Sequence, residues 1–343
     1  MEDIDIFLKM IKQKYNYDDE LIKALKIVIP LFDEEPQEEI FNVINNVRIF
    51  LTEDMSLENQ NKIRKEMLQD KYQEMEEPED NMYHVETEPG SYYSYEPLFD
   101  EENNFKEEIR WLVLKKEPTA KYQSLFNTTI NIPYLIHELE HAYMMQKPMY
   151  EKSGENTLSK HGMLFEEYSK INNTMQPIRQ EDIILEEMFT ELFTQEKLVR
   201  LLKKQDYTEV SQELKNINHV NTSYNILLTK IAEIFQNTVG KERIYNYRKY
   251  NDFELREDFN ETAKESNIKD KYFKKIDAWK YLSDCCTRIF GFSHNKLNYS
   301  LEEYKELQKN EMMKAFAPIH AYKEIKYNSS SLQNYENIGK SIR

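Results

Sequence analysis

The chain has 343 residues, of which 40% are hydrophobic and 31% are charged, and this composition is typical of a folded globular protein. Its formal net charge of −16 argues against a general nucleic-acid-binding role and against docking on anionic membranes, because both surfaces attract basic proteins. Six glycines are few for the many turns of an all-β fold.

The N-terminal part of the chain is predicted to be helical. Residues 3–73 contain the segments IDIFLKMI, ELIKALKIVIPLF and EEIFNVINNVRIFL, each with apolar residues three to four apart. The acidic first residues lack the basic-then-apolar order of a signal peptide, and no apolar run approaches the roughly 18 residues that cross a bilayer. We therefore expect no membrane span and a cytoplasmic location, with leaderless secretion as the alternative.

A change in composition follows this helical part. The acidic, proline-containing segment MEEPEDN interrupts the helical pattern, and the next segment, MYHVETEPGSYYSYEPLF, reads as irregular structure or short strands. The apolar run Trp111–Leu114 can be a strand or a short helix, and its position favours a buried strand. We expect a small sheet at this point, beside the helix that comes next.

Residues 137–141 read HELEH, and a chain of this composition is expected to contain only about 0.03 such matches by chance. The surrounding sequence predicts a helix, with Pro133 in its first turn and Pro148 beyond its end. His137 and His141 then project from one face, one turn apart, so that both imidazoles can bind one metal ion. Glu138 lies beside them, where it can take a proton from a water molecule activated by the metal.

A catalytic zinc ion uses three protein ligands and keeps one open position, so a third ligand is required. One candidate is His161, in SKHGMLFEEYSKIN, and the other is Glu187, in IILEEMFTELFTQEKL. The segment QKPMYEKSGENTLSKHG lies between the two predicted ligand helices and includes His161, and it is read as a loop that shapes the substrate pocket.

The second stretch predicts an amphipathic helix. Glu187 and Glu191 are i, i+4 neighbours on its polar face, so one carboxylate can bind the metal while the other accepts the far N–H group of a ligand histidine. Glu186 is a weaker candidate because its i+3 and i+7 neighbours are Phe189 and Phe193.

The C-terminal part is again predicted to be helical, from segments such as YNILLTKIAEIFQNTVG and LEEYKELQKNEMMKAFAPI. Cys285 and Cys286 are adjacent, which fits neither a disulfide framework nor a CxxC zinc site, and we expect reduced thiols inside a helix. The abundance of Asn, Lys, Ile and Tyr is typical of an AT-rich bacterial or phage genome.

LIHELEHAY followed by LEEMFTELFT resembles the gluzincins, zinc peptidases whose HExxH motif is completed by a glutamate on a later helix. It is similar in particular to bacterial zincin-like proteins with HELxHA and then LNEGxTEYLT. ExxTxxFT also resembles the ExxAxxFA helix of metallopeptidases that cleave phage-type repressors. These resemblances cover residues 130–200, about a fifth of the chain, and imply Glu187 as third ligand, with Glu191 in the TE position. This chain departs from the pattern at Glu186, usually Asn, and Met188, usually Gly.

A second resemblance competes with the first. HELEHAY followed by HGMLFEEYSKIN is similar to the SprT-like peptidases, and this similarity implies His161 as third ligand, with Phe165 and Asn172 matching further positions. SprT-like enzymes act on DNA-bound proteins and usually carry basic DNA-binding parts, which a net charge of −16 does not fit. A cysteine zinc ribbon is also absent from the sequence. Glu187 is therefore preferred, and His161 stays open as the alternative.

We predict an α+β fold that is predominantly helical, with a zincin-like core and a small sheet beside the HExxH helix. The core is placed at residues 79–200, between helical regions at 1–78 and 201–325, and a polar tail follows at 326–343. The predicted function is hydrolysis of a peptide or protein substrate, with one Zn²⁺ per chain.

The resemblance to gluzincins also implies a downstream Tyr, His or Arg that stabilises the oxyanion, and Tyr224 and His219 are the nearest candidates. Two further alternatives stay open. The chain can be a non-catalytic zinc-binding or interaction protein, or a secreted effector protease. Glu138 argues against the non-catalytic alternative, because a structural zinc site gains nothing from a general base.

Overall fold

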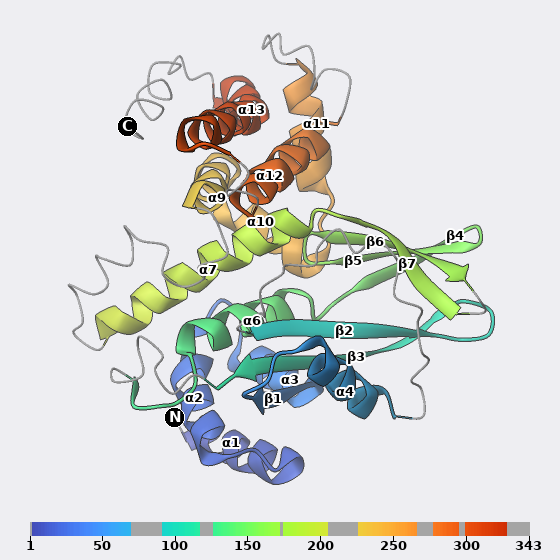
Figure 1. Ribbon diagram of the computed structural model, residues 1–343, viewed down its shortest axis with the longest axis vertical. Helices are drawn as coiled ribbons and strands as arrows, with labels where there is room; N and C mark the ends of the chain where they lie inside the picture. The colour runs from blue at the N-terminus through green and yellow to red at the C-terminus, as the bar shows by residue number, and fades with distance from the viewer. Residues whose placement is uncertain are drawn as a thin grey trace.

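The computed structural model describes residues 2–69, 91–116, 126–171, 174–204, 226–265, 277–294 and 299–327. These residues form a predominantly helical α+β fold with two small sheets, which confirms the predicted fold class (Figure 1). The helices are α1 (Glu2–Tyr15), α2 (Asp19–Val28), the 3₁₀ helix η1 (Ile29–Leu31), α3 (Gln37–Asn46), α4 (Leu57–Leu68), α6 (Ile132–Met144), α7 (Ile183–Lys204), α9 (Ile226–Val239), α10 (Lys241–Tyr250), α11 (Glu254–Glu265), α12 (Ala278–His294) and α13 (Leu301–Tyr327). The strands are β1 (Val47–Thr52), β2 (Ser91–Phe99), β3 (Phe105–Lys115), β4 (Met149–Ser153), β5 (Asn156–His161), β6 (Leu164–Ile171) and β7 (Thr174–Glu181).

The N-terminal region contains a strand that the helical prediction for residues 3–73 missed. The predicted helix ends at Asn46, and β1 begins at Val47. Two asparagines weaken the helix at its end, and VRIFLT is rich in residues that suit strands. Strand β1 pairs in parallel with β3, from Val47 opposite Arg110 to Thr52 opposite Lys115, and this long-range partner outweighs the local helical pattern.

The first sheet has the strand order β1-β3-β2, and β2 runs antiparallel to β3. The strand predicted at Trp111–Leu114 is confirmed, and all four of its side chains are buried. Trp111 and Val113 pack beneath α4, whereas Leu112 and Leu114 join the core that contains α6. Strand β2 is an edge strand, with β3 as its hydrogen-bonded neighbour among the described strands.

The second sheet is an antiparallel meander with the order β4-β5-β6-β7. It corrects the loop expected in QKPMYEKSGENTLSKHG, because β4 and β5 lie there and turn at Gly154, whose φ of +66° suits glycine. The sequence pattern of β4 is weak because its side chains are half-buried or exposed. Pairing along the whole meander therefore determines these strands more than their own sequence does.

Two large hydrophobic clusters meet at α6 and α7. The first contains α1–α3, β1, β3 and the apolar face of α6, including Leu135 and Leu139. The second contains the first turns of α7, including Phe189 and Phe193, and packs them against α9–α13. Figure 1 shows α7 lying across α6, with the first sheet below and the C-terminal helices above. The polar faces of α6 and α7 are therefore left to face each other between the two cores.

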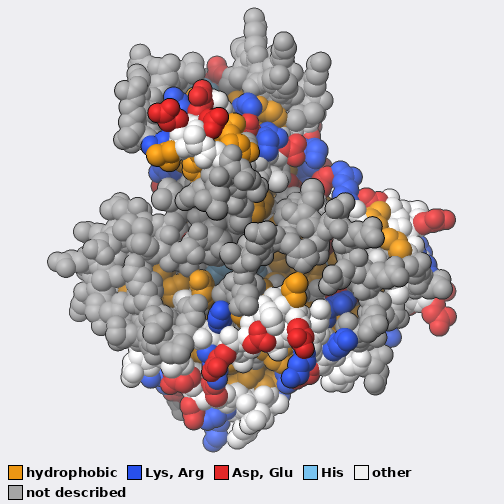
Figure 2. Space-filling model, in the orientation of Figure 1, with side chains coloured by type: hydrophobic (Ala, Val, Ile, Leu, Met, Phe, Trp, Pro, Cys, Tyr) orange, Lys and Arg blue, Asp and Glu red, His pale blue; other side chains and the backbone are white. Residues whose placement is uncertain are grey.

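The described helices include none that is both long and apolar enough to cross a membrane. On the face shown in Figure 2, acidic and basic side chains are intermixed over the described residues.

Helix α7 continues to Lys204, past the domain boundary predicted at residue 200, and β1 of the predicted N-terminal region belongs to the sheet of the predicted core. Cys285 and Cys286 are buried free thiols in α12.

Candidate metal centre

Helix α6 carries the HELEH motif, and its start is fixed by local chemistry. The side chain of Asn131 accepts a hydrogen bond from the backbone N–H of Tyr134, and Pro133 occupies the first turn, as predicted. The helix ends at Met144, before Pro148. Nearly every residue of α6 is buried, because its apolar face enters the first core and its polar face lies under α7.

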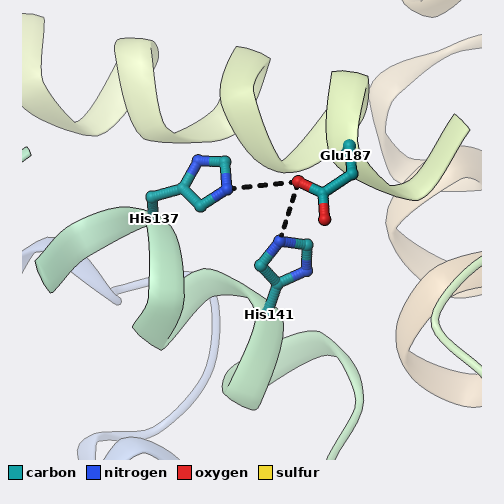
Figure 3. Close-up of side chains that lie close together, drawn as sticks. All are labelled: His137, His141 and Glu187. Atoms are coloured by element: carbon teal, nitrogen blue, oxygen red, sulfur yellow. Dashed lines mark hydrogen bonds and ion pairs between the residues drawn. The ribbon is translucent and has the colours of Figure 1, made fainter. Parts of the chain in front are cut away.

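Three predicted ligands converge at one point between the two helices (Figure 3). The Nε2 atoms of His137 and His141 lie 3.3 Å and 3.2 Å from Oε2 of Glu187. Among the described residues, these three form the one group of histidine, cysteine or acidic side chains close enough to hold a metal ion. The histidine side chains are 4% and 7% exposed and that of Glu187 is 23% exposed, so the group opens to solvent on the side of Glu187.

The two separations from Glu187 to the histidines fit a tetrahedral ion, and all three donor atoms lie within 4.8 Å of one another. A metal bound at about 2.0–2.1 Å by tetrahedral ligands places neighbouring donor atoms about 3.3 Å apart. The distances from Glu187 Oε2 to the two Nε2 atoms match this value without rearrangement. Two imidazoles and one carboxylate are also a donor set of catalytic zinc sites, which leave a fourth position open.

Each ligand histidine has a carboxylate at its far nitrogen. Glu191 Oε2 lies 3.3 Å from Nδ1 of His137, the ring nitrogen turned away from Glu187. Glu186 Oε1 lies 3.4 Å from Nδ1 of His141. In metal sites a carboxylate that accepts the far N–H of a ligand histidine orients the imidazole. At His141 the hydroxyl of Thr190 is also within hydrogen-bond distance of Nδ1, at 3.3 Å.

Glu186 was considered a weaker ligand candidate because its i+3 and i+7 neighbours are Phe189 and Phe193. In the structure its side chain is buried among polar groups instead. Its partner is Arg248, more than sixty positions away on α10, with Nη2 and Nε at 2.5 Å and 3.1 Å from the two carboxylate oxygens. No local spacing could indicate this contact. The available signal was the departure from the family pattern, in which Asn is usual at this position.

Glu138 lies on the same helix, and Oγ of Ser91, the first residue of β2, donates a hydrogen bond of 2.7 Å to it. Burial raises the pKa of the Glu138 carboxyl, although the charges of His137 and His141 oppose this effect. The pKa of Glu138 is therefore closer to neutral pH than that of an exposed glutamate.

The charges of the group depend on one another. Burial lowers the pKa of both ligand histidines, but the surrounding carboxylates more than compensate, so the pKa of His141 rises to about 9 and that of His137 rises well above its usual value. Burial raises the pKa of Glu187, but the two histidines lower it by more, so that the pKa lies well below its usual range. Metal binding at this group must therefore release protons from the imidazoles.

The rival ligand His161 lies elsewhere, at the end of β5. Its Nε2 is 2.9 Å from Glu108 Oε2 and 3.0 Å from the Tyr150 hydroxyl, and its ring stacks on Tyr95. His161 is fully buried by these contacts, which join the two sheets, and the structure does not bring it into the group around Glu187. The proposed oxyanion residues Tyr224 and His219, and Asn172 of the SprT-like pattern, lie outside the described residues.

The glycine after His161 approaches the site closely. Gly162 has φ of +59°, and a Cβ atom there would lie 2.6 Å from Oε2 of Glu186. We expect Gly162→Ala to destabilise the fold by about 2–3 kcal/mol in urea unfolding, because left-handed strain adds to a clash with a buried carboxylate. Gly154→Ala is the matched control, since Gly154 has φ of +66° and open space around its Cβ position. Equal losses for the two variants would contradict the close contact at Gly162.

No protein-family model, curated protein or solved structure matches this chain. The functional argument therefore depends on the geometry of the site itself.

Proposed function

We propose that this chain is a zinc-dependent peptidase of the gluzincin type. The observation that carries the proposal is the convergence of His137, His141 and Glu187 from two helices on one point, with Glu138 in the adjacent position on α6. A structural zinc site is closed by four protein ligands, whereas this group offers three and opens to solvent.

The residues divide the chemistry among them. His137, His141 and Glu187 would hold the ion, and a bound zinc would supply a Lewis acid that polarises a carbonyl group and lowers the pKa of water toward neutral. Glu138 accepts the proton of the attacking water and transfers it to the leaving amine, while Ser91 holds one carboxylate oxygen in place.

The sheet beside the site suits an extended peptide. Strand β2 has one hydrogen-bonded edge, on β3, and the other edge is unpaired among the described strands. Its first residue, Ser91, is in direct contact with Glu138, so the strand passes beside the general base. An edge strand offers backbone N–H and C=O groups to which a peptide substrate can add as a further strand.

The competing proposals have less support. The SprT-like alternative needs His161 as a ligand, and the Nε2 atom of His161 is already paired with Glu108 and Tyr150. The non-catalytic alternative gives no role to the contact between Ser91 and Glu138.

Elemental analysis of purified, folded protein is the first test. We expect about one zinc per chain in the wild type and in His161→Ala, and loss of that zinc in Glu187→Ala, because removal of one of three ligands destroys the site. Purification without chelators keeps a weakly held ion in place.

Two results would contradict the proposal. Loss of zinc from His161→Ala alone would favour the SprT-like assignment and direct the substrate search to DNA-bound proteins. Wild-type protein that takes up no zinc, even after dialysis against it, would reduce HELEH to a chance motif on a buried helix.

A further inference from the structure

We propose that Glu186 and Arg248 act as a positioning pair for His141, so that helix α10 of the C-terminal region sets the orientation of a metal ligand on α6. The inference deepens the proposed function and rests on it, because it concerns the same metal centre. It adds a requirement for Arg248, which lies on α10 and thus outside both helices that supply the ligands.

The contact between the Glu186 and Arg248 side chains is bidentate and buried. Nη2 of Arg248 lies 2.5 Å from Oε1 of Glu186, and Nε lies 3.1 Å from Oε2. The side chains are 0% and 3% exposed. Two parallel hydrogen bonds between a guanidinium and a carboxylate fix the plane of the carboxylate as well as its position.

Other contacts close the remaining directions around Glu186. Oε2 accepts the backbone N–H of Met163 at 2.9 Å, and Oε1 accepts the hydroxyl of Thr190 at 3.1 Å. Gly162 permits this close approach because it has no Cβ. Gly162, the glycine of the HG pair, thus lies beside Glu186. Oε1 of Glu186 lies 3.4 Å from Nδ1 of His141, and the hydroxyl of Thr190 lies 3.3 Å from the same nitrogen.

Arg248 also reaches the ligand helix itself. Its Nη1 lies 3.3 Å from Oε1 of Glu140, the residue immediately before His141, and the side chain of Glu140 is fully buried. One guanidinium therefore bridges a residue adjacent to His141 on α6 and a residue adjacent to Glu187 on α7. This arrangement ties the two ligand-bearing helices together at the level of the ligands.

The charge of Glu186 needs an explanation, because a neutral amide could accept the same imidazole N–H group. An ionised carboxylate in this position makes the imidazole a stronger donor to the metal, but an unpaired buried charge is strongly destabilising. Arg248 supplies the counter-charge directly, in an ion pair of 2.5 Å between side chains that are 0% and 3% exposed. The pair is thus a way to place a charged partner behind His141.

The test is zinc affinity, measured by competition with a chromophoric chelator on the full chain. Glu186→Gln keeps the shape of the side chain, and Arg248→Lys keeps the charge but not the two-pronged contact. We expect each variant to bind zinc about 10–100-fold more weakly than wild type, because outer partners of metal ligands have effects of this size. We expect the zinc affinity of the double variant to equal that of the single variant with the larger loss, since both substitutions act through one contact.

Asp182→Asn is the matched control. Asp182 is a buried carboxylate immediately before α7, it accepts a hydrogen bond from Trp279, and its left-handed backbone tolerates asparagine. The zinc affinity of the Asp182→Asn variant should equal that of wild type. The absorption spectrum of bound Co²⁺ gives a second readout, and it should change in Glu186→Gln and stay unchanged in Asp182→Asn.

Wild-type affinity in folded Glu186→Gln, or additive losses in the double variant, would overturn the positioning role while leaving the zinc site itself intact. Absence of zinc binding by the wild type would overturn the proposed function, and the positioning role with it. The two failures are therefore distinguishable by the wild-type measurement alone.

Discussion

Glu138→Gln is expected to lower kcat/KM for peptide hydrolysis by about 10²–10⁴-fold while the protein keeps its bound zinc, because an amide cannot accept the proton of the attacking water. The change is nearly isosteric, and Gln can still accept the hydrogen bond that Ser91 donates. Rates would be measured by mass spectrometry on peptides that wild-type protein cleaves from a mixed library, with zinc content determined on the same samples.

Asp182→Asn again supplies the control, since it makes the same change of carboxylate to amide in a buried residue that contacts Trp279 and Arg256. Its rate should equal that of wild type. Residual activity of Glu138→Gln within tenfold of wild type would remove Glu138 from the role of general base. A parallel loss of zinc would show that the residue acts on the metal centre and not on the proton.

Lys197→Met is expected to destabilise the fold by up to about 3–5 kcal/mol, because the buried carboxylate of Glu140 loses one of its two counter-charges and keeps only Arg248. The side chain of Lys197 on α7 is 1% exposed, and its Nζ lies 2.9 Å from both Glu140 and Glu34. Burial lowers the pKa of Lys197, but the two carboxylates raise it by more, so the lysine is charged at neutral pH. Urea unfolding followed by circular dichroism measures the loss.

Lys230→Met tests whether burial is the cause. Lys230 pairs with Glu233 at 2.6 Å, but both side chains are more than 40% exposed. An exposed ion pair contributes about 0–1 kcal/mol, so this variant should unfold almost as wild type does. Similar losses in both lysine variants would mean that the Lys197 pairs contribute no more than a surface contact.

Local spacing predicted the parts of the site that lie within single helices. The i, i+4 pattern placed His137 and His141 on one face, and the same pattern placed Glu191 beside Glu187. Both relations are properties of one helix, and they hold wherever the helix packs. The prediction that the two helices lie side by side came from the resemblance to gluzincins, because polar faces alone do not reveal which helices face each other.

Contacts between distant segments explain what the sequence missed. Strand β1 owes its conformation to β3, and β4 and β5 owe theirs to the meander they belong to. Glu186 looked unsuited to a polar role because its helical neighbours are apolar, but Arg248 of α10 donates a hydrogen bond to its carboxylate. Spacing within a segment carries no information about such partners, because tertiary packing outweighs local preference.

Helix α7 presents Glu186, Glu187 and Glu191 to two histidines and carries Lys197 two turns further on. Each residue added to an α-helix turns everything beyond it by about 100°. A single insertion after Glu187 would therefore swing Glu191 and Lys197 away from their partners together, whereas a substitution removes one contact at a time. Proteins related to this chain should consequently tolerate substitutions on the exposed face of α7 better than any change in the number of residues between Glu186 and Lys197.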